Sequence, residues 1–343
     1  MTAPCDLPRP PRSPGRRNSA GQAACRRSGL LILALLLAGC GARTSPTSSP
    51  GFPQPLPAAT TSPAPTPSPT PRPALLLVGG EAEDSLTSTL HSWAEQRGWE
   101  FRETIGSDLG PEVAAAVLVG AQGQAALPAL LAAEVPVVTL DLEGVSAAPR
   151  ISTVGQPGAR RDQAGFLAGA LAGLISQSGE VGLIGDPADE PYQTAFLHGL
   201  RYLCVGCSLV GLAPEAASVD AFRAKGVGVV AVLPGAGAGS AAQTLAGAGF
   251  WLVLVDHPAE PFDPNEVAAR VVFEAGAMLT GALEALLSGQ PGQAWPYSVE
   301  LDSVRVVEVH SAALSAGRQQ VLDEIVGALA AGSLDPGVDP KGP

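Results

Sequence analysis

The amino-acid sequence predicts an α/β fold with parallel sheets, and three observations support this. Short runs of valine, leucine and isoleucine alternate with helical segments through the last 270 residues of the 343-residue chain. These runs lack polar alternation, which is typical of strands buried on both faces of a parallel sheet. Most of them end in glycine or aspartate, where the chain turns toward a helix. With 46% hydrophobic residues, the chain can bury the core that such a fold requires.

The expected strands are short and rich in branched apolar residues, which favours a strand over a helix. They are, in chain order, residues 74–78, 99–104, 114–119, 135–140, 151–154, 181–184, 207–212, 227–233, 251–255 and 303–309. The expected helices are rich in alanine and leucine at helical spacing. They are residues 85–97, 125–133, 163–176, 191–203, 240–248, 265–287 and 319–331. This number of elements is sufficient for two parallel sheets.

The loops that follow the strands are the expected ligand-contacting segments, because ligands of open α/β sheets bind beyond the carboxyl ends of the strands. The candidate ligand-binding residues in these loops are Asp84, Gln122, Asp186, Tyr192, Gly235, Gly237, Gly239, Asp256 and His257.

Several of these residues also have a purely structural interpretation. The glycines of residues 235–239 form either a tight strand–helix turn or a backbone that approaches a ligand closely. Asp141 follows a strand, where capping of the next turn is favoured over ligand contact. Asp186 and Glu190 suit the N-terminal end of a helix dipole. For His257, just before a proline, a loop position is favoured over a ligand contact or a catalytic role.

The N-terminus has the organisation of an export signal. Residues 1–39 carry six arginines and a single acid, and residues 30–38 form an apolar run that is too short to span a membrane. The sequence Leu-Ala-Gly-Cys at 37–40 is similar to a bacterial lipobox, in which the signal is cut before a cysteine that carries lipid. We therefore expect a signal peptide over residues 1–39 and a lipid anchor at Cys40. The alternative is a plain secretory signal with an incidental cysteine.

A linker is expected over residues 40–73, which are rich in proline, serine, threonine and alanine. Dense proline favours extended polyproline II over helix or sheet. The segment is either a stalk between the membrane and the domain or a spacer of no set length.

The net charge of −12 argues against a nucleic-acid-binding protein, which needs a basic face. Without residues 1–39 the chain has 14 basic and 31 acidic residues, a net charge of −17. This acidity opposes adsorption of the exported body to anionic lipid.

Cys204 and Cys207 are the only cysteines after Cys40. In an exported chain, a local disulfide between a helix end and the next strand is favoured over a redox site, which would place the pair at a helix N-terminus. The four histidines are scattered and no second cysteine pair exists, so we expect no metal site and no cofactor. The glycine spacing at 235–239 does not fit a dinucleotide fingerprint, and no hydrolase or metalloprotease motif is present. The sequence therefore favours a protein that is not an enzyme.

Three blocks of sequence resemble one family. The first block is Ile-Ser-Thr-Val at 151–154 together with Ala-Gly-Phe-Leu-Ala-Gly-Ala-Leu-Ala-Gly at 164–173. The second is Glu-Val-Gly-Leu-Ile-Gly-Asp at 180–186 together with Pro-Tyr-Gln-Thr-Ala-Phe-Leu-His-Gly-Leu at 191–200. The third is Val-Ala-Val-Leu-Pro-Gly-Ala-Gly-Ala-Gly-Ser at 230–240, followed by a strand that ends at Asp256. In order and spacing, these blocks are similar to the basic membrane protein family, the lipoprotein substrate-binding components of ABC importers, many specific for purine nucleosides.

This resemblance implies a type I periplasmic-binding-protein fold, in which two lobes enclose a ligand cleft. It implies lobe 1 over residues 74–177 with 257–298 returning to it, and lobe 2 over 178–256 with about 299–312 returning to it. Residues 313–343 form a C-terminal helix and tail.

The family's ligand-binding motifs are matched only in part. Asp84 and Ser85 fit the first cleft motif, and Asp256 fits the last. The aromatic residues that sandwich a purine in the family have no counterparts in these motifs, and only Tyr192 and His257 could replace them. The resemblance implies a lipid-anchored solute-binding protein that delivers a small polar ligand, such as a nucleoside, to an ABC permease. The alternative is an orphan or sensory binding lipoprotein with no transport role.

Overall fold

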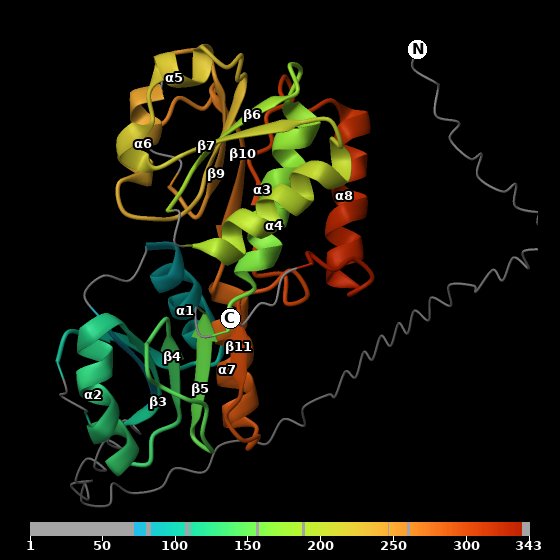
Figure 1. The fold of residues 1–343 in the computed structure, drawn as a ribbon. Helices are drawn as coiled ribbons and strands as arrows, with labels where there is room; N and C mark the ends of the chain where they lie inside the picture. The colour runs from blue at the N-terminus through green and yellow to red at the C-terminus, as the bar shows by residue number, and fades with distance from the viewer. Residues whose placement is uncertain are drawn as a thin grey trace, which may run out of the picture. The chain divides into compact units, whose positions relative to one another are not determined.

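The computed structural model describes residues 72–337, except 80–83, 107–109, 111, 156–157, 187–188, 246 and 259–260. The expected signal peptide, Cys40 and the expected linker up to residue 71 lie outside the described residues. Figure 1 shows two sheets, each covered by helices on both faces. In the described part of the chain, no helix is both long and apolar enough to cross a membrane.

The first sheet has six parallel strands in the order β11-β5-β4-β3-β1-β2. Its strands are β1 (Ala74–Val78), β2 (Glu100–Thr104), β3 (Val113–Val119), β4 (Val137–Leu140), β5 (Ile151–Gly155) and β11 (Ala294–Pro296). Helices α1 (Asp84–Gln96) and α7 (Gly276–Leu287) cover one face, and α2 (Gly120–Ala132) covers the other. We call this sheet with its helices lobe 1.

The second sheet has the order β12-β10-β9-β8-β6-β7, in which only the β10–β12 pair is antiparallel. Its strands are β6 (Glu180–Ile184), β7 (Ser208–Leu212), β8 (Val229–Val232), β9 (Trp251–Val255), β10 (Val267–Phe273) and β12 (Val304–Val307). One face carries α3 (Arg161–Ile175), α4 (Glu190–Leu203) and α8 (Ala316–Ala330), and the other carries α5 (Val219–Arg223) and α6 (Ala238–Leu245). The 3-10 turn Pro214–Ala216 lies close to α6. We call this sheet with its helices lobe 2.

The unbroken apolar strands supply both faces of each sheet. In β1, Leu75 and Leu77 pack toward α1, whereas Leu76 and Val78 pack toward α2. All four are almost completely buried. A strand in this position must be apolar at every residue, because successive side chains point to opposite faces. This explains why the strands lack polar alternation.

Helices α3 and α4 pack unusually closely because glycines line their contact. Gly165 and Gly169 of α3 are four residues apart and therefore lie on one face of the helix. A Cβ at Gly169 would lie 2.0 Å from the Phe196 carbonyl oxygen of α4. In the reverse direction, a Cβ at Gly199 would lie 2.0 Å from the Phe166 carbonyl oxygen. Only residues without a side chain allow the two backbones to approach this closely.

The helix expected over residues 265–287 is wrong. Its first part is strand β10 and its second part is helix α7, with only Glu274 and Ala275 between them. The valines at 267, 271 and 272 pair with β9 and β12, so tertiary pairing outweighs the helical pattern of the region. The sequence also gave no indication of two short elements, α5 and β11.

The expected lobe boundaries differ from the sheet membership in two places. Helix α3 packs on β8, β9 and β10, so it belongs to lobe 2 and not to the segment 74–177 of lobe 1. Strand β10 also belongs to lobe 2, so only α7 and β11 of the segment 257–298 return to lobe 1. The chain therefore passes between the lobes after β5, after β10 and after β11. We call these passages the first, second and third crossings.

Cys204 and Cys207 form a disulfide with a Cα–Cα distance of 5.3 Å. The bond closes the short turn between the end of α4 and the start of β7.

Candidate ligand-binding site

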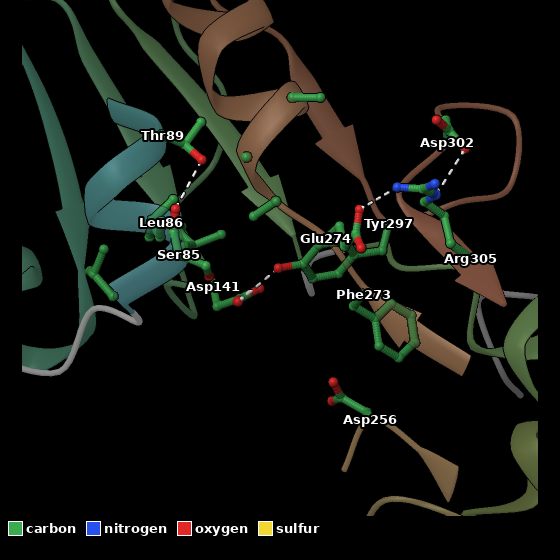
Figure 2. A pocket seen from close by; sticks show the side chains of 15 residues that line it. Ser85, Leu86, Thr89, Asp141, Asp256, Phe273, Glu274, Tyr297, Asp302 and Arg305 are labelled. Carbon is green, nitrogen blue, oxygen red and sulfur yellow. Dashed lines mark hydrogen bonds and ion pairs between the residues drawn. The ribbon is translucent and has the colours of Figure 1, made fainter. Parts of the chain in front are cut away.

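A cavity of about 610 Å³ is lined by residues from both lobes. Lobe 1 contributes the ends of β3 and β4 and the first turn of α1, and lobe 2 contributes the end of β9. The second and third crossings supply further lining residues, including Glu274, Ala275 and Tyr297. The cavity therefore lies at the carboxyl ends of the parallel strands, where this class of sheet binds ligands (Figure 2).

Asp141 and Asp256 occupy equivalent positions in the two lobes. Each follows the third strand of its sheet, β4 or β9, counted from the β11 or β12 edge. The Asp141 amide donates to the Val154 carbonyl at 3.0 Å, and the Asp256 amide donates to the Val271 carbonyl at 2.8 Å. Both residues have left-handed backbones, with φ of 53° and 54°. The same turn thus brings one carboxylate from each lobe to the cavity.

Two aromatic rings lie at the cavity, although the family's aromatic motifs are absent from the sequence. The rings of Phe273 and Tyr297 have centroids 5.1 Å apart. The Tyr297 hydroxyl donates to Oδ2 of Asp141 at 3.2 Å, which ties the third crossing to lobe 1 (Figure 2). The rings are supplied by the end of β10 and by the residue after β11.

Arg305 is the only basic residue that lines the cavity in the described part of the chain, and acids hold it. Its Nη1 lies 2.7 Å from Oε2 of Glu274, and its Nε lies 3.5 Å from Oδ1 of Asp302. The Glu274 hydrogen bond and the charges of both acids raise the pKa of Arg305. This cluster forms an exposed rim of the cavity between β10 and β12 (Figure 2).

A second cavity of about 280 Å³ adjoins the first at the start of α2. The two share Val119, Leu140 and Asp141 as lining residues. Gln122 lines only the smaller cavity.

The structure places three of the sequence-predicted residues at these cavities. Ser85 and Asp256 line the larger cavity, and Gln122 lines the smaller one. Asp141, for which capping was favoured, lines both. Asp84 begins α1 and is exposed outside the cavity lining.

The other predicted residues lie elsewhere on lobe 2. Tyr192 belongs to the first turn of α4 and is almost completely buried, and desolvation and the charge of Asp256 raise its pKa. Asp186 is exposed after β6, and Gln193 donates to its carbonyl. The His257 Nε2–H donates to the Leu233 carbonyl at 3.1 Å, as expected of a residue that fixes a loop.

The glycine-rich run has the conformation of a turn. Gly235 and Gly237 have φ of 152° and 78°, which favour glycine. Gly239 lies within α6 beside the His257 ring. None of the three lines either cavity.

Sequence reasoning missed Phe273, Tyr297 and Arg305. The misassigned helix at 265–287 hid the strand that ends at Phe273. A useful signal was the run Val-Val-Phe at 271–273, whose β-branched and aromatic residues favour a strand. Within the described residues, no group of three or more histidine, cysteine, aspartate or glutamate side chains could hold a metal ion.

Gly155 sets the position of the Asp141 carboxylate. It has φ of 105°, and a Cβ there would lie 2.0 Å from Oδ1 of Asp141 and 3.1 Å from Cε2 of Tyr297. We expect Gly155→Ala to displace this pair and to weaken ligand binding at least tenfold, measured by titration calorimetry. Gly144→Ala is the matched control, since Gly144 has φ of 72° and open space around it. Equal binding by both variants would contradict this role of Gly155.

Comparison with known proteins gives structural similarity but no sequence family. No family model and no curated protein matches the chain. An ABC transporter system solute-binding protein from Conexibacter woesei DSM 14684 has a TM-score of 0.57 at 14% identity, over 77% of this chain and 98% of that one. A second ABC transporter solute-binding protein, from Aeropyrum pernix K1, has a TM-score of 0.50 at 14% identity, over 77% and 93% of the two chains.

The chain has the type I periplasmic-binding-protein fold. A protein of Bacillus halodurans described as a transcriptional activator of the comK gene is similar to the same extent, with a TM-score of 0.58 at 13% identity, over 77% of this chain and 99% of that one. These similarities support the two-lobe α/β architecture expected from the sequence. Membership in the basic membrane protein family stays a prediction.

Proposed function

We propose that this chain is the extracytoplasmic solute-binding component of an ABC importer, anchored through lipid on Cys40, and that the larger cavity holds a small polar ligand. The observation that carries this proposal is the cavity itself, which is lined by strand ends of both lobes and by two crossings of the chain. Its volume of about 610 Å³ suits a small-molecule ligand. Closure of the lobes about the crossings would bury that ligand.

The lining residues favour binding over catalysis. Among the described residues, no histidine or cysteine lines the larger cavity. Carboxylates that accept hydrogen bonds and aromatic rings that cover an apolar face are instead groups that orient a ligand. Two of the proteins with this fold are described as ABC transporter solute-binding proteins, which supports the same role.

The resemblance to the basic membrane protein family favours a nucleoside as the ligand. Phe273 and Tyr297 could cover a base, and Asp141 and Asp256 could accept hydrogen bonds from ribose hydroxyls. These residues offer the aromatic and acidic groups that such a ligand needs.

A sensory binding protein without a permease is the second candidate function. It is favoured by the similarity to the Bacillus halodurans protein, which is described as a transcriptional activator. Permease and ATPase genes beside the gene for this chain would favour import, and their absence would favour sensing.

A thermal-shift screen of the purified protein tests the proposed binding role. A true ligand at one hundred times its Kd stabilises the protein by about 2.7 kcal/mol, which corresponds to a rise in Tm of several degrees. The screen should include nucleosides, bases, sugars, amino acids and amines. A ligand that still produces the full shift with Gly155→Ala would place binding outside this cavity.

Substitution of Cys40 tests the anchor. We expect Cys40→Ala to move the protein from the membrane fraction to the soluble fraction, because the acyl chains contribute about 0.8 kcal/mol per buried CH₂. Fractionation followed by immunoblotting measures this distribution. Cys25→Ala, inside the expected signal peptide, is the control and should leave the protein in the membrane fraction. An unchanged distribution of Cys40→Ala would contradict the anchor.

A further inference from the structure

The charges around the larger cavity restrict which ligands it can accept. Four acids line it, namely Asp141, Asp256, Glu274 and Asp302, against the single guanidinium of Arg305. The ionised side chains of the lining therefore have a formal net charge of −3. We propose that the ligand of this cavity is an organic cation, such as a protonated amine. This inference rests on the proposed binding function, and for the same site it replaces the nucleoside favoured by the family resemblance with a positively charged ligand.

Arg305 is poorly placed to bind an anion. Its guanidinium is held by Glu274 at 2.7 Å and by Asp302 at 3.5 Å. An anionic ligand would have to compete with these two carboxylates. It would also face Asp141 and Asp256, whose like charges repel it.

Charged groups beside the cavity do not reverse the negative net charge of its lining. Arg161, at the start of α3, lies 3.9 Å from Asp189 and is paired with it. Burial raises the pKa of the Tyr192 hydroxyl, and the charges of Asp256 and Asp189 add to this rise while the charge of Arg161 opposes it. Asp189 therefore offsets the positive charge that Arg161 brings to this side of the site.

The aromatic pair gives the cavity a second means of holding a cation. The ring of Tyr297 is almost completely buried, that of Phe273 is half-buried, and both line the cavity. An ammonium group over such a ring is attracted by the ring quadrupole, and this attraction grows as water is excluded. A cavity that combines carboxylates with aromatic faces suits an amine better than an anion or a neutral sugar.

A cation also explains how the lobes could close. Asp141 belongs to lobe 1 and Asp256 to lobe 2, so closure without a ligand brings two like charges together. A cation between them converts this repulsion into attraction and stabilises the closed form. Figure 2 shows both carboxylates at the open space that contains the Tyr297 and Phe273 rings.

Titration calorimetry on the purified full chain tests the inference with seven probes. Putrescine, spermidine and choline are the cations, adenosine and D-ribose the neutral probes, and succinate and D-ribose 5-phosphate the anions. We expect binding by at least one cation and none by the anions. The cation affinity should fall about tenfold or more as salt rises from about 10 mM to about 1 M, because the Debye length falls from about 30 Å to about 3 Å.

Three variants separate charge from structure. Asp141→Asn and Asp256→Asn keep the size of the side chain, and asparagine also tolerates the left-handed backbone. Each should weaken cation binding about tenfold, whereas Arg305→Gln should strengthen it a few-fold. Asp323→Asn, on the exposed surface of α8, is the control and should change nothing. Because damage to the fold would lower affinity in every variant, the opposite effect of Arg305→Gln identifies the role of charge.

The outcomes separate the inference from the proposed function. Binding of adenosine or D-ribose without any cation would overturn the inference and leave the binding function intact. Binding of an anion would likewise overturn the inference. If no probe binds and no compound of the broader screen stabilises the protein, the binding function fails as well.

Discussion

Gly169→Ala should destabilise the protein by about 3 kcal/mol or more, because the added methyl group has no room between α3 and α4. The added Cβ would lie 2.0 Å from the Phe196 carbonyl oxygen and 2.8 Å from the Leu200 amide nitrogen. Both atoms belong to the backbone of α4, so no side-chain rotation can relieve the contact. Overpacking of a core costs typically 1–3 kcal/mol, and here two helices must separate.

The effect runs against helix propensity, which makes it easy to recognise. Alanine is favoured over glycine within a helix by roughly 1 kcal/mol. Gly327→Ala in α8 is the matched control, because nothing lies within 4 Å of a Cβ at that position. Urea denaturation should show a lower midpoint for Gly169→Ala and an unchanged or higher midpoint for Gly327→Ala.

Gly199→Ala gives an independent check from the other helix. Its Cβ would lie 2.0 Å from the Phe166 carbonyl oxygen, so we expect a loss similar to that of Gly169→Ala. If both variants unfold at the wild-type midpoint, the close approach of α3 and α4 does not stabilise lobe 2.

The sequence predicted the sheet architecture because several inner strands of both sheets, such as β1, β8 and β9, are apolar along their whole length. Val181–Ile184 and Trp251–Val255 need no context to be recognised as buried strands. Strand β10 was missed because Glu274 and Ala275, between β10 and α7, favour a helix, and a helical pattern tolerates the single glycine that follows them, Gly276. Strand β11 has only three residues and includes Pro296, which excludes it from the pattern of a central strand.

Residues of the site could be predicted only where they directly follow a strand that the sequence pattern identifies. Asp256 was identified because it directly follows the apolar run of β9. Tyr297 lies on the third crossing, and no local pattern shows that this segment passes between two lobes. Tyr192 lines neither cavity and is almost completely buried, because an aromatic residue near a helix start can also pack in the core. Long-range topology decides such positions, and a single sequence contains little information about it.

Asp162→Ala should destabilise the protein by about 3 kcal/mol, because it removes the centre of a buried polar network between the first and third crossings. Asp162 is fully buried, and its carboxylate accepts from Nε of Arg160 at 3.0 Å and from Nη2 at 2.9 Å. The Arg160 amide donates to the Tyr297 carbonyl at 2.7 Å, and Gln163 bonds both Glu300 and the Val299 amide. Removal of one partner from a buried ion pair typically costs 3–5 kcal/mol, and the partial exposure of Arg160 places the loss at the lower end.

An exposed ion pair is the control that shows whether burial causes the loss of stability in Asp162→Ala. Glu100 lies 2.7 Å from Arg102 on the edge strand β2, and its side chain is 51% exposed. Glu100→Ala should therefore change the stability far less than Asp162→Ala does, because solvent screens an exposed ion pair. Asp162→Asn keeps the side-chain volume but removes the charge, so it should still lose most of the stability that Asp162→Ala loses. Urea midpoints for the three variants measure these differences. If Asp162→Ala and Glu100→Ala have equal midpoints, the buried carboxylate of Asp162 contributes no more to stability than a surface charge does. Packing of the surrounding sheets and helices would then hold the two crossings in place.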